Sequence, residues 1–121
     1  MNPGEITALF DKWNAALQSG SPKNVVDLYK HDAILLPTIS NLVRHNHKEI
    51  EDYFVLFLEQ GPQGKINEFN IRLYGEIATN SGIYTFTLRD GSEVQARFTF
   101  VYEWNGERWL IAEHHSSRMP E

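Results

Sequence analysis

The sequence predicts a single α+β domain in which three N-terminal helices pack on a strongly curved, mixed or antiparallel sheet. Apart from one extended stretch, apolar residues in the first half recur every three or four positions, which is the helical period. From residue 68 onward they alternate with polar residues, as in half-buried strands. When helices precede antiparallel strands, the helices gather on one face of the sheet. The chain has the size of one domain, and we expect residues 1–121 to form it.

The ends of the first two helices are set by residues that stop or start a helix. The first helix covers residues 5–19 and ends at Gly20, which adopts the conformation of a helix C-terminus without strain. Ser21 then caps and Pro22 begins a short second helix, where the missing N–H of proline costs nothing. This second helix carries the apolar residues Val25, Val26, Leu28 and Tyr29.

A third, strongly amphipathic helix follows an extended segment at residues 32–36. Pro37 limits that segment to an edge strand or a strand end. Asn46 and Glu49 have the spacing of a capping pair at the start of the helix, and Gly61 ends it. The apolar face of the helix consists of Ile50, Tyr53, Phe54, Phe57 and Leu58.

The rest of the chain is predicted to be sheet. We expect strands at residues 68–74, 82–88, 92–104 and 108–117. Two turns separate the last three strands, Asp90-Gly91 and Asn105-Gly106. Asn-Gly between alternating apolar runs is a strong hairpin signal.

A two-residue turn at Asn105-Gly106 would set Trp104 opposite Glu107 and so fix the register of the last hairpin. Counting outward pairs Tyr102 with Trp109, Phe100 with Ile111, Phe98 with Glu113 and Arg97 with His114. One face is then strongly apolar and carries Val94, Ala96, Phe98, Phe100, Tyr102, Trp109 and Ile111. In this register Glu113 and His115 share the apolar face. A β-bulge would exchange the two faces beyond it.

Composition narrows the class of partner. The chain has no cysteine, which excludes disulfides and thiolate chemistry. A net charge of −5 without a Lys/Arg cluster argues against nucleic acid and anionic membranes. No apolar run approaches the roughly 20 residues of a membrane span, and no secretory leader is evident, so we expect a cytoplasmic protein. Small molecules, other proteins and copies of itself remain as partners.

Glu113 and His115, with His114 between them, are the candidates for catalysis. A carboxylate and an imidazole on an apolar face must be paired or face a cavity, because an isolated buried charge is costly. Two interpretations stay open. The pair is either an acid/base couple whose pKa values are moved by burial, or a polar pair that anchors the last strand.

Arg97 is the first candidate for ligand binding. A guanidinium group presents a planar fork of donors that matches a carboxylate, and we expect His114 and Arg72 nearby. The alternative is a salt bridge from Arg97 to Glu68, Glu93 or Glu103 on a neighbouring strand.

Other motifs give weaker indications. The spacing of His45, His47, His114 and His115 matches no usual ligand set, so we expect no metal site. No Gly-rich phosphate loop or nucleophile elbow is present, and we expect no cofactor. Several aromatic residues either line a ligand cavity or form the core, namely Trp13, Tyr53, Phe54, Phe57, Phe98, Phe100 and Trp109.

The stretch from Phe100 to Pro120 resembles the C-terminal hairpin of the association domain of calcium/calmodulin-dependent protein kinase II. The match rests on a tryptophan followed by a histidine, a serine and a proline, here Trp109, His115, Ser117 and Pro120. Earlier segments are similar to the same group, including its bacterial stand-alone, SnoaL-like members. These segments are Val26-Asp27-Leu28-Tyr29, Leu35-Leu36-Pro37-Thr38 and Asp52-Tyr53-Phe54.

The resemblance implies a nuclear transport factor 2-like cone, dimers assembled into rings, and a pocket between helices and sheet that accepts small carboxylates. It places Tyr84, Thr99 and Ser116 where the kinase association domain has pocket arginines, with Arg97 as the nearest substitute. The candidate ligand-binding residues are therefore Arg97, His114, Tyr84, Arg72, Tyr53, Trp13, Thr99 and Ser116. The chain has no kinase motifs and no basic amphipathic helix, so we do not expect calmodulin as a partner.

Three functional hypotheses follow. The leading one is a self-associating domain that forms a homodimer or a larger ring and binds a small ligand such as a carboxylate. The second is a small SnoaL-like isomerase, cyclase or hydrolase that transfers protons through Glu113, His115 or His114. The third is a scaffold that binds a partner protein through its sheet.

Overall fold

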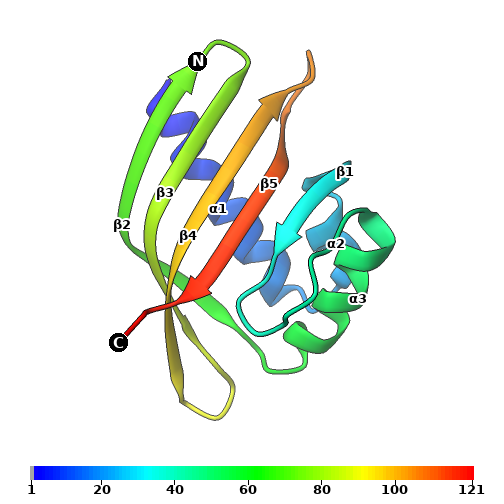
Figure 1. Cartoon of the computed structure of the whole chain (residues 1–121), viewed down its shortest axis with the longest axis vertical. Coiled ribbons are helices and arrows are strands. Elements are labelled where there is room, and N and C mark those ends of the chain that lie inside the picture. The colour runs from blue at the N-terminus through cyan, green and yellow to red at the C-terminus, as the bar shows by residue number, and fades with distance from the viewer. Residues whose placement is uncertain (1) are drawn as a thin grey trace.

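The computed structural model describes residues 2–121 as a curved five-stranded sheet with helices on one face (Figure 1). The elements are α1 (Pro3–Gln18), α2 (Pro22–Val26), β1 (Tyr29–Leu36), α3 (His47–Leu58), β2 (Gln63–Tyr74), β3 (Ile77–Thr87), β4 (Glu93–Trp104) and β5 (Trp109–Arg118). The strand order is β1-β5-β4-β3-β2, with β1 parallel to β5 and all other neighbours antiparallel. The predicted α+β class and mixed sheet are confirmed.

The helix caps agree with the sequence, but the second helix is shorter than expected. Asn46 accepts a hydrogen bond of 3.0 Å from the N–H of Glu49, which confirms this cap. The second helix ends at Val26, and Tyr29 opens β1 instead of belonging to the helix. The reason is a backbone bond of 2.9 Å from Ile111 to the carbonyl of Leu28, which draws the chain into the sheet.

The β2–β3 hairpin is longer than expected. β2 begins at Gln63 and β3 at Ile77, five residues before each predicted start. Apart from one isoleucine in each, both additions are polar or small and lack alternation, but pairing with the neighbouring strand holds them in the sheet. A bulge at Asn67 interrupts this pairing opposite Ile83 and Tyr84.

The register of the last hairpin differs from the predicted one. Trp104 pairs with Trp109, so four residues rather than two connect β4 and β5. Asn105 explains the longer loop, because its side-chain oxygen accepts from the N–H groups of both Glu107 and Arg108, at 2.9 Å each.

Further along β5, Val101 pairs with Glu113 whereas Tyr102 pairs with Ile111, which leaves Ala112 as an extra residue. This bulge exchanges the faces of β5 beyond Ile111. His114 and Ser116 are consequently buried, while Glu113 and His115 are exposed. The prediction that Glu113 and His115 share the apolar face is wrong, for the reason that a bulge intervenes.

The core lies between the inner face of the sheet and the helices, and it is largely aromatic. Trp13 of α1 packs on Tyr84, with the two rings nearly parallel and their centroids 6.3 Å apart. Phe54 of α3 and Phe100 of β4 each meet Trp13 in a T-shaped arrangement, with ring centroids 6.4 and 5.5 Å away. None of the helices in residues 2–121 combines the length and apolar character that a membrane span requires.

Gly82 is required where β2 and β3 approach each other at the bulge. A Cβ atom at this position would lie 2.7 Å from the carbonyl carbon of Glu68, in contact with rigid backbone rather than a movable side chain. We therefore expect Gly82→Ala to lower the free energy of unfolding by about 1–3 kcal/mol, as overpacked sites do. Urea denaturation measures the change. Ser81→Ala, in the same strand on the other face, is the control, and equal stabilities of the two variants would contradict the expectation.

Candidate functional site

A continuous chain of six side chains crosses the interior beneath β5. The indole N–H of Trp13 donates to the hydroxyl of Tyr29 at 3.1 Å, and this hydroxyl lies 2.8 Å from Nδ1 of His114. On the other side of the ring, Nε2 lies 3.2 Å from the hydroxyl of Tyr84. Tyr84 in turn donates to Ser116 at 2.6 Å. The chain ends where Ser116 meets Thr38.

The direction of these bonds fixes the tautomer of His114. Trp13 can only donate, so Tyr29 accepts from it and directs its own proton to Nδ1 of His114. Tyr84 uses its proton on Ser116, so it accepts from Nε2 of His114. We therefore assign the neutral Nε2–H tautomer. A protonated ring would leave the buried hydroxyl of Tyr29 without an acceptor.

Burial also favours the neutral form of the His114 ring. Desolvation, together with a smaller effect of the neighbouring His115, lowers the pKa of His114 from 6.5 to about 3. Burial likewise raises the pKa of Tyr29 and that of Tyr84 well above the ordinary value of 10. Each of these groups is therefore neutral at physiological pH. Phe100 stacks on the imidazole at a centroid distance of 4.0 Å.

A small cavity adjoins this chain. Its walls are Trp13, Leu35, Pro37, Thr38, Tyr53, Phe54, Phe57, Tyr84, Phe86, His114 and Ser116. The space open to the centre of a water molecule is about 10 Å³, which is close to the minimum that holds one water. The lining contains no Asp, Glu, Lys or Arg. As folded, the cavity is suited to an uncharged, water-sized group.

Five of the predicted ligand residues meet at this cavity. They are Trp13, Tyr53, Tyr84, His114 and Ser116. The structure does not bring the other three to it, because Arg72, Arg97 and Thr99 pair with outward-facing residues of β3. Both arginines are exposed. Arg97 and His114 therefore lie on opposite faces of the sheet, and the carboxylate clamp expected of them is not assembled.

The remaining candidates are dispersed. No ion pair within residues 2–121 joins Arg97 to the carboxylates expected as its alternative partners. His45 pairs with Glu49 at 2.9 Å, and Nε2 of His47 bonds the backbone carbonyl of Tyr29 at 2.7 Å. No group of three or more potential metal ligands forms within residues 2–121.

Sequence reasoning missed Tyr29 and Thr38 as members of the site. The structure places Tyr29 on the inner side of β1 with Ala33 and Leu35 rather than in the second helix. His31 interrupts the apolar alternation between Tyr29 and Ala33, so the sequence carries no clear strand signal there. Thr38 follows Pro37 in a loop, and no periodicity identifies it. Its role depends on Ser116, which is 78 positions away in the chain.

The curved five-stranded sheet with helices in its hollow has the fold of nuclear transport factor 2-like, or cystatin-like, α+β domains. A nuclear transport factor 2-like protein from Pseudomonas putida superposes with a TM-score of 0.83 at 16% identity, covering 94% of this chain and 84% of that one. A cystatin-like protein from Nostoc punctiforme superposes with a TM-score of 0.82 at 16% identity, covering 97% and 90%.

The family is narrower than the fold. The chain belongs to the calcium/calmodulin dependent protein kinase II association domain family, whose model matches residues 2–120. A Xanthomonas campestris protein assigned by name to the same family is 53% identical, with a TM-score of 0.93, and the match covers 97% of this chain and 87% of that one. A comparison with curated proteins gives no match.

Lowering the pH from 7 to 4 should destabilise the fold through His114. The unfolded chain takes up a proton on this imidazole near pH 6.5, whereas the folded chain keeps it neutral down to about pH 3. The unfolded state binds more protons in this window. The free energy of unfolding therefore decreases as the pH is lowered, by up to about 1.4 kcal/mol per pH unit. Above pH 6.5 the imidazole is neutral in both the folded and the unfolded chain, so His114 no longer lowers the free energy of unfolding. Urea unfolding at several pH values measures the slope.

Two variants isolate this contribution. His114→Gln keeps a donor and an acceptor but does not titrate, so its stability should depend less on pH between 6.5 and 3. His115→Gln changes the exposed neighbour and should keep most of the slope of the parent, because the burial of His114, the larger cause of its low pKa, is unchanged. Nitrogen-15 NMR of the parent ring should show the neutral Nε2–H form at pH 5. A folded-state titration of His114 near pH 6.5 would contradict both the tautomer and the expected slope.

Proposed function

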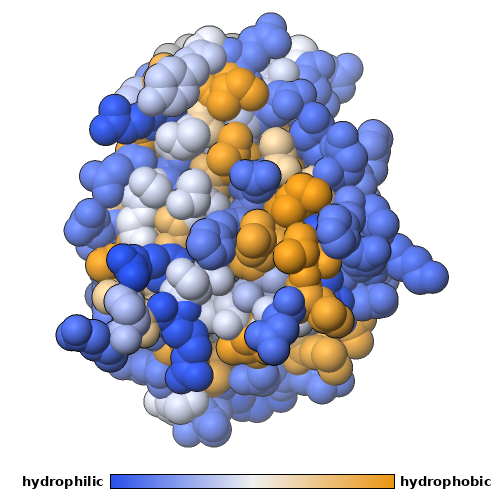
Figure 2. Space-filling model, in the orientation of Figure 1, coloured by the Kyte–Doolittle hydropathy of each residue, from blue (hydrophilic) through white to orange (hydrophobic). Residues whose placement is uncertain are grey.

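We propose that this chain is a self-associating domain whose copies meet through the outer face of the sheet. The observation that carries the proposal is the distribution of charge on that face. Its centre, on β3 and β4, is uncharged and half-buried, and consists of Thr79, Ser81, Ile83, Thr99 and Val101. In Figure 2, pale residues of intermediate hydropathy cover much of this region.

Charged residues surround this centre. Glu68 and Arg72 flank it on β2, and Glu113 flanks it on β5, while Arg97 lies at its lower end on β4. An uncharged centre with charges of both signs at the rim is the usual anatomy of a protein–protein contact. Membership of a family named for association supports the same proposal.

The proposal assigns the inner cavity an uncharged group of about the size of a water molecule rather than a carboxylate. A carboxylate would enter without a guanidinium or ammonium partner, because no cationic side chain lines the cavity. Its polar wall instead offers hydroxyl groups and a neutral imidazole. Proton transfer through Glu113 and His115 gains no support from their position, since both are exposed on the opposite face from His114.

Light scattering across a dilution series tests self-association, with a species larger than the 14.0 kDa chain as the expected result. Thr99→Arg places a charge at the centre of the proposed contact. We expect the dissociation constant to rise at least about a hundredfold, because an unpaired charge in a desolvated contact is strongly unfavourable. Gln18→Arg, on the exposed end of α1, adds the same charge elsewhere and should leave the mass unchanged. A monomer at micromolar concentration would overturn the proposal.

A further inference from the structure

The two edge strands of the sheet, β1 and β2, differ in how far other parts of the chain cover them and prevent pairing with a further strand. At β1, Leu35 and Arg44 exchange two backbone hydrogen bonds of 2.9 Å, so the returning loop covers this edge. At the start of β2, the side chain of Asn14 bonds the N–H of Gly64 at 2.8 Å and its carbonyl at 3.0 Å. Within residues 2–121 no comparable contact covers the second half of β2, which runs along the open side of the sheet (Figure 1).

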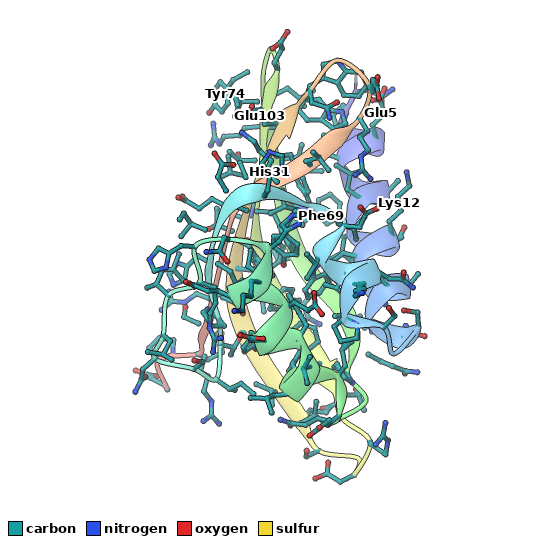
Figure 3. The ribbon with its side chains drawn as sticks, turned by 90° about the vertical axis from the view of Figure 1, so that its right-hand side faces the viewer. Glu5, Lys12, His31, Phe69, Tyr74 and Glu103 are labelled. Carbon is teal, nitrogen blue, oxygen red and sulfur yellow. The ribbon has the colours of Figure 1, made fainter. Side chains whose placement is uncertain are left out.

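The open half of β2 has an apolar side and a charged side. Glu68, Asn70 and Arg72 pair with outward-facing residues of β3, while Phe69 and Ile71 pair with inward-facing ones. Phe69 is nevertheless 51% exposed, because it lies beside α1 rather than under it. Figure 3 shows Phe69 on the helix side of the sheet and Tyr74 on the outer side. A strand edge that is both unpaired and apolar is a template for another strand.

We propose that this stretch pairs with the same stretch of a second copy, antiparallel about a two-fold axis that passes through Asn70. In this register Glu68 lies opposite Arg72 of the second copy, and Arg72 lies opposite its Glu68. On the other side of the sheet, Phe69 lies opposite Ile71 of the second copy. Each of the five residues from 68 to 72 thus meets a chemically compatible residue.

Neighbouring registers are less favourable. A shift by one residue would bring the charged side of one copy against the apolar side of the other. A shift by two residues would place Glu68 opposite Asn70 or opposite Tyr74, and neither neutralises its charge. Within residues 2–121 Arg72 has no ion-pair partner, and the carboxylate of Glu68 bonds the amide of Asn70 at 3.0 Å. The two-fold register supplies a partner for both charges.

This contact is a second one between copies, and it rests on the proposed self-association. The contact through the sheet face is centred on β3 and β4, and the contact through the β2 edge is centred on Asn70. They share Glu68 and Arg72, which lie at the rim of the first contact and pair with each other in the second. Each is isologous, meaning that the same surface contributes from both copies. Two different isologous contacts on one chain are sufficient to join dimers into larger assemblies.

Exchanging the charges at positions 68 and 72 tests the proposed register of the β2–β2 pairing. Glu68→Arg or Arg72→Glu alone places like charges opposite each other twice, and we expect either to raise the dissociation constant of the edge contact about tenfold. The double variant restores opposite charges in exchanged positions and should recover the parent value. A double variant as weak as the single ones would overturn the register.

Cross-linking tests the contact independently, because the chain has no cysteine of its own. Asn70→Cys places two thiols on the two-fold axis, and mild oxidation should yield a disulfide-linked dimer. Tyr74→Cys is the matched control on the same strand and face. In the proposed register its two copies lie eight positions apart, about 27 Å at ~3.4 Å per residue, so it should not cross-link.

The two proposals fail in distinguishable ways. A disulfide-linked Asn70→Cys dimer that also forms in the presence of Thr99→Arg supports the edge contact by itself. If light scattering shows association but Asn70→Cys cross-links no faster than Tyr74→Cys, the edge contact is overturned and self-association stands. If the chain is a monomer and Asn70→Cys does not cross-link, both proposals are overturned.

Discussion

The extra residue in β5 determines which side chains face the interior. Without the bulge at Ala112, strand alternation would turn Glu113 and His115 inward, against Phe98 and Phe100. A carboxylate there would lose its hydration without a cationic partner, which is far more costly than one irregular step in a strand. With the bulge, the inward positions belong to His114 and Ser116. These two groups can be satisfied by hydroxyls, and the rest of the interior is arranged around them.

The buried chain from Trp13 to Thr38 illustrates how strongly such groups depend on one another. A typical hydrogen bond contributes only about 1 kcal/mol net, but a buried polar group that loses its partner costs about 1–3 kcal/mol. The hydroxyls of Tyr29 and Tyr84 each accept one bond and donate another, so the loss of either leaves an unsatisfied group on both sides. Such networks hold their members in one arrangement. The four elements that supply them, α1, β1, β3 and β5, are thereby held in one relative position.

Sequence reasoning succeeded where a local signal exists. The caps at Asn46 and Ser21 and the change of period after the third helix were sufficient for the order of elements and the fold class. It failed at Ala112, because alanine fits a regular strand as well as a bulge and carries no mark of either. Because the bulge was not predicted, His114 was expected on the outer face of the sheet, beside Arg97. Tyr29 and Thr38 were missed because their roles arise from contacts with residues far away in the chain.

The position of the charged residues follows from which side chains fill the interior. The inner face of the sheet is occupied by aromatic rings and by a neutral hydrogen-bond chain, so no charge can be accommodated there. Arg72, Arg97, Glu68 and Glu113 must then lie on the outer face or at its margins. Cross-strand packing leaves uncharged Thr, Ser, Ile and Val residues at the centre of that face. The bulges at Asn67 and Ala112 complete this separation, because each resets the alternation of its strand so that charge points outward. The irregularities that build the interior therefore also shape the surface through which copies of the chain can meet.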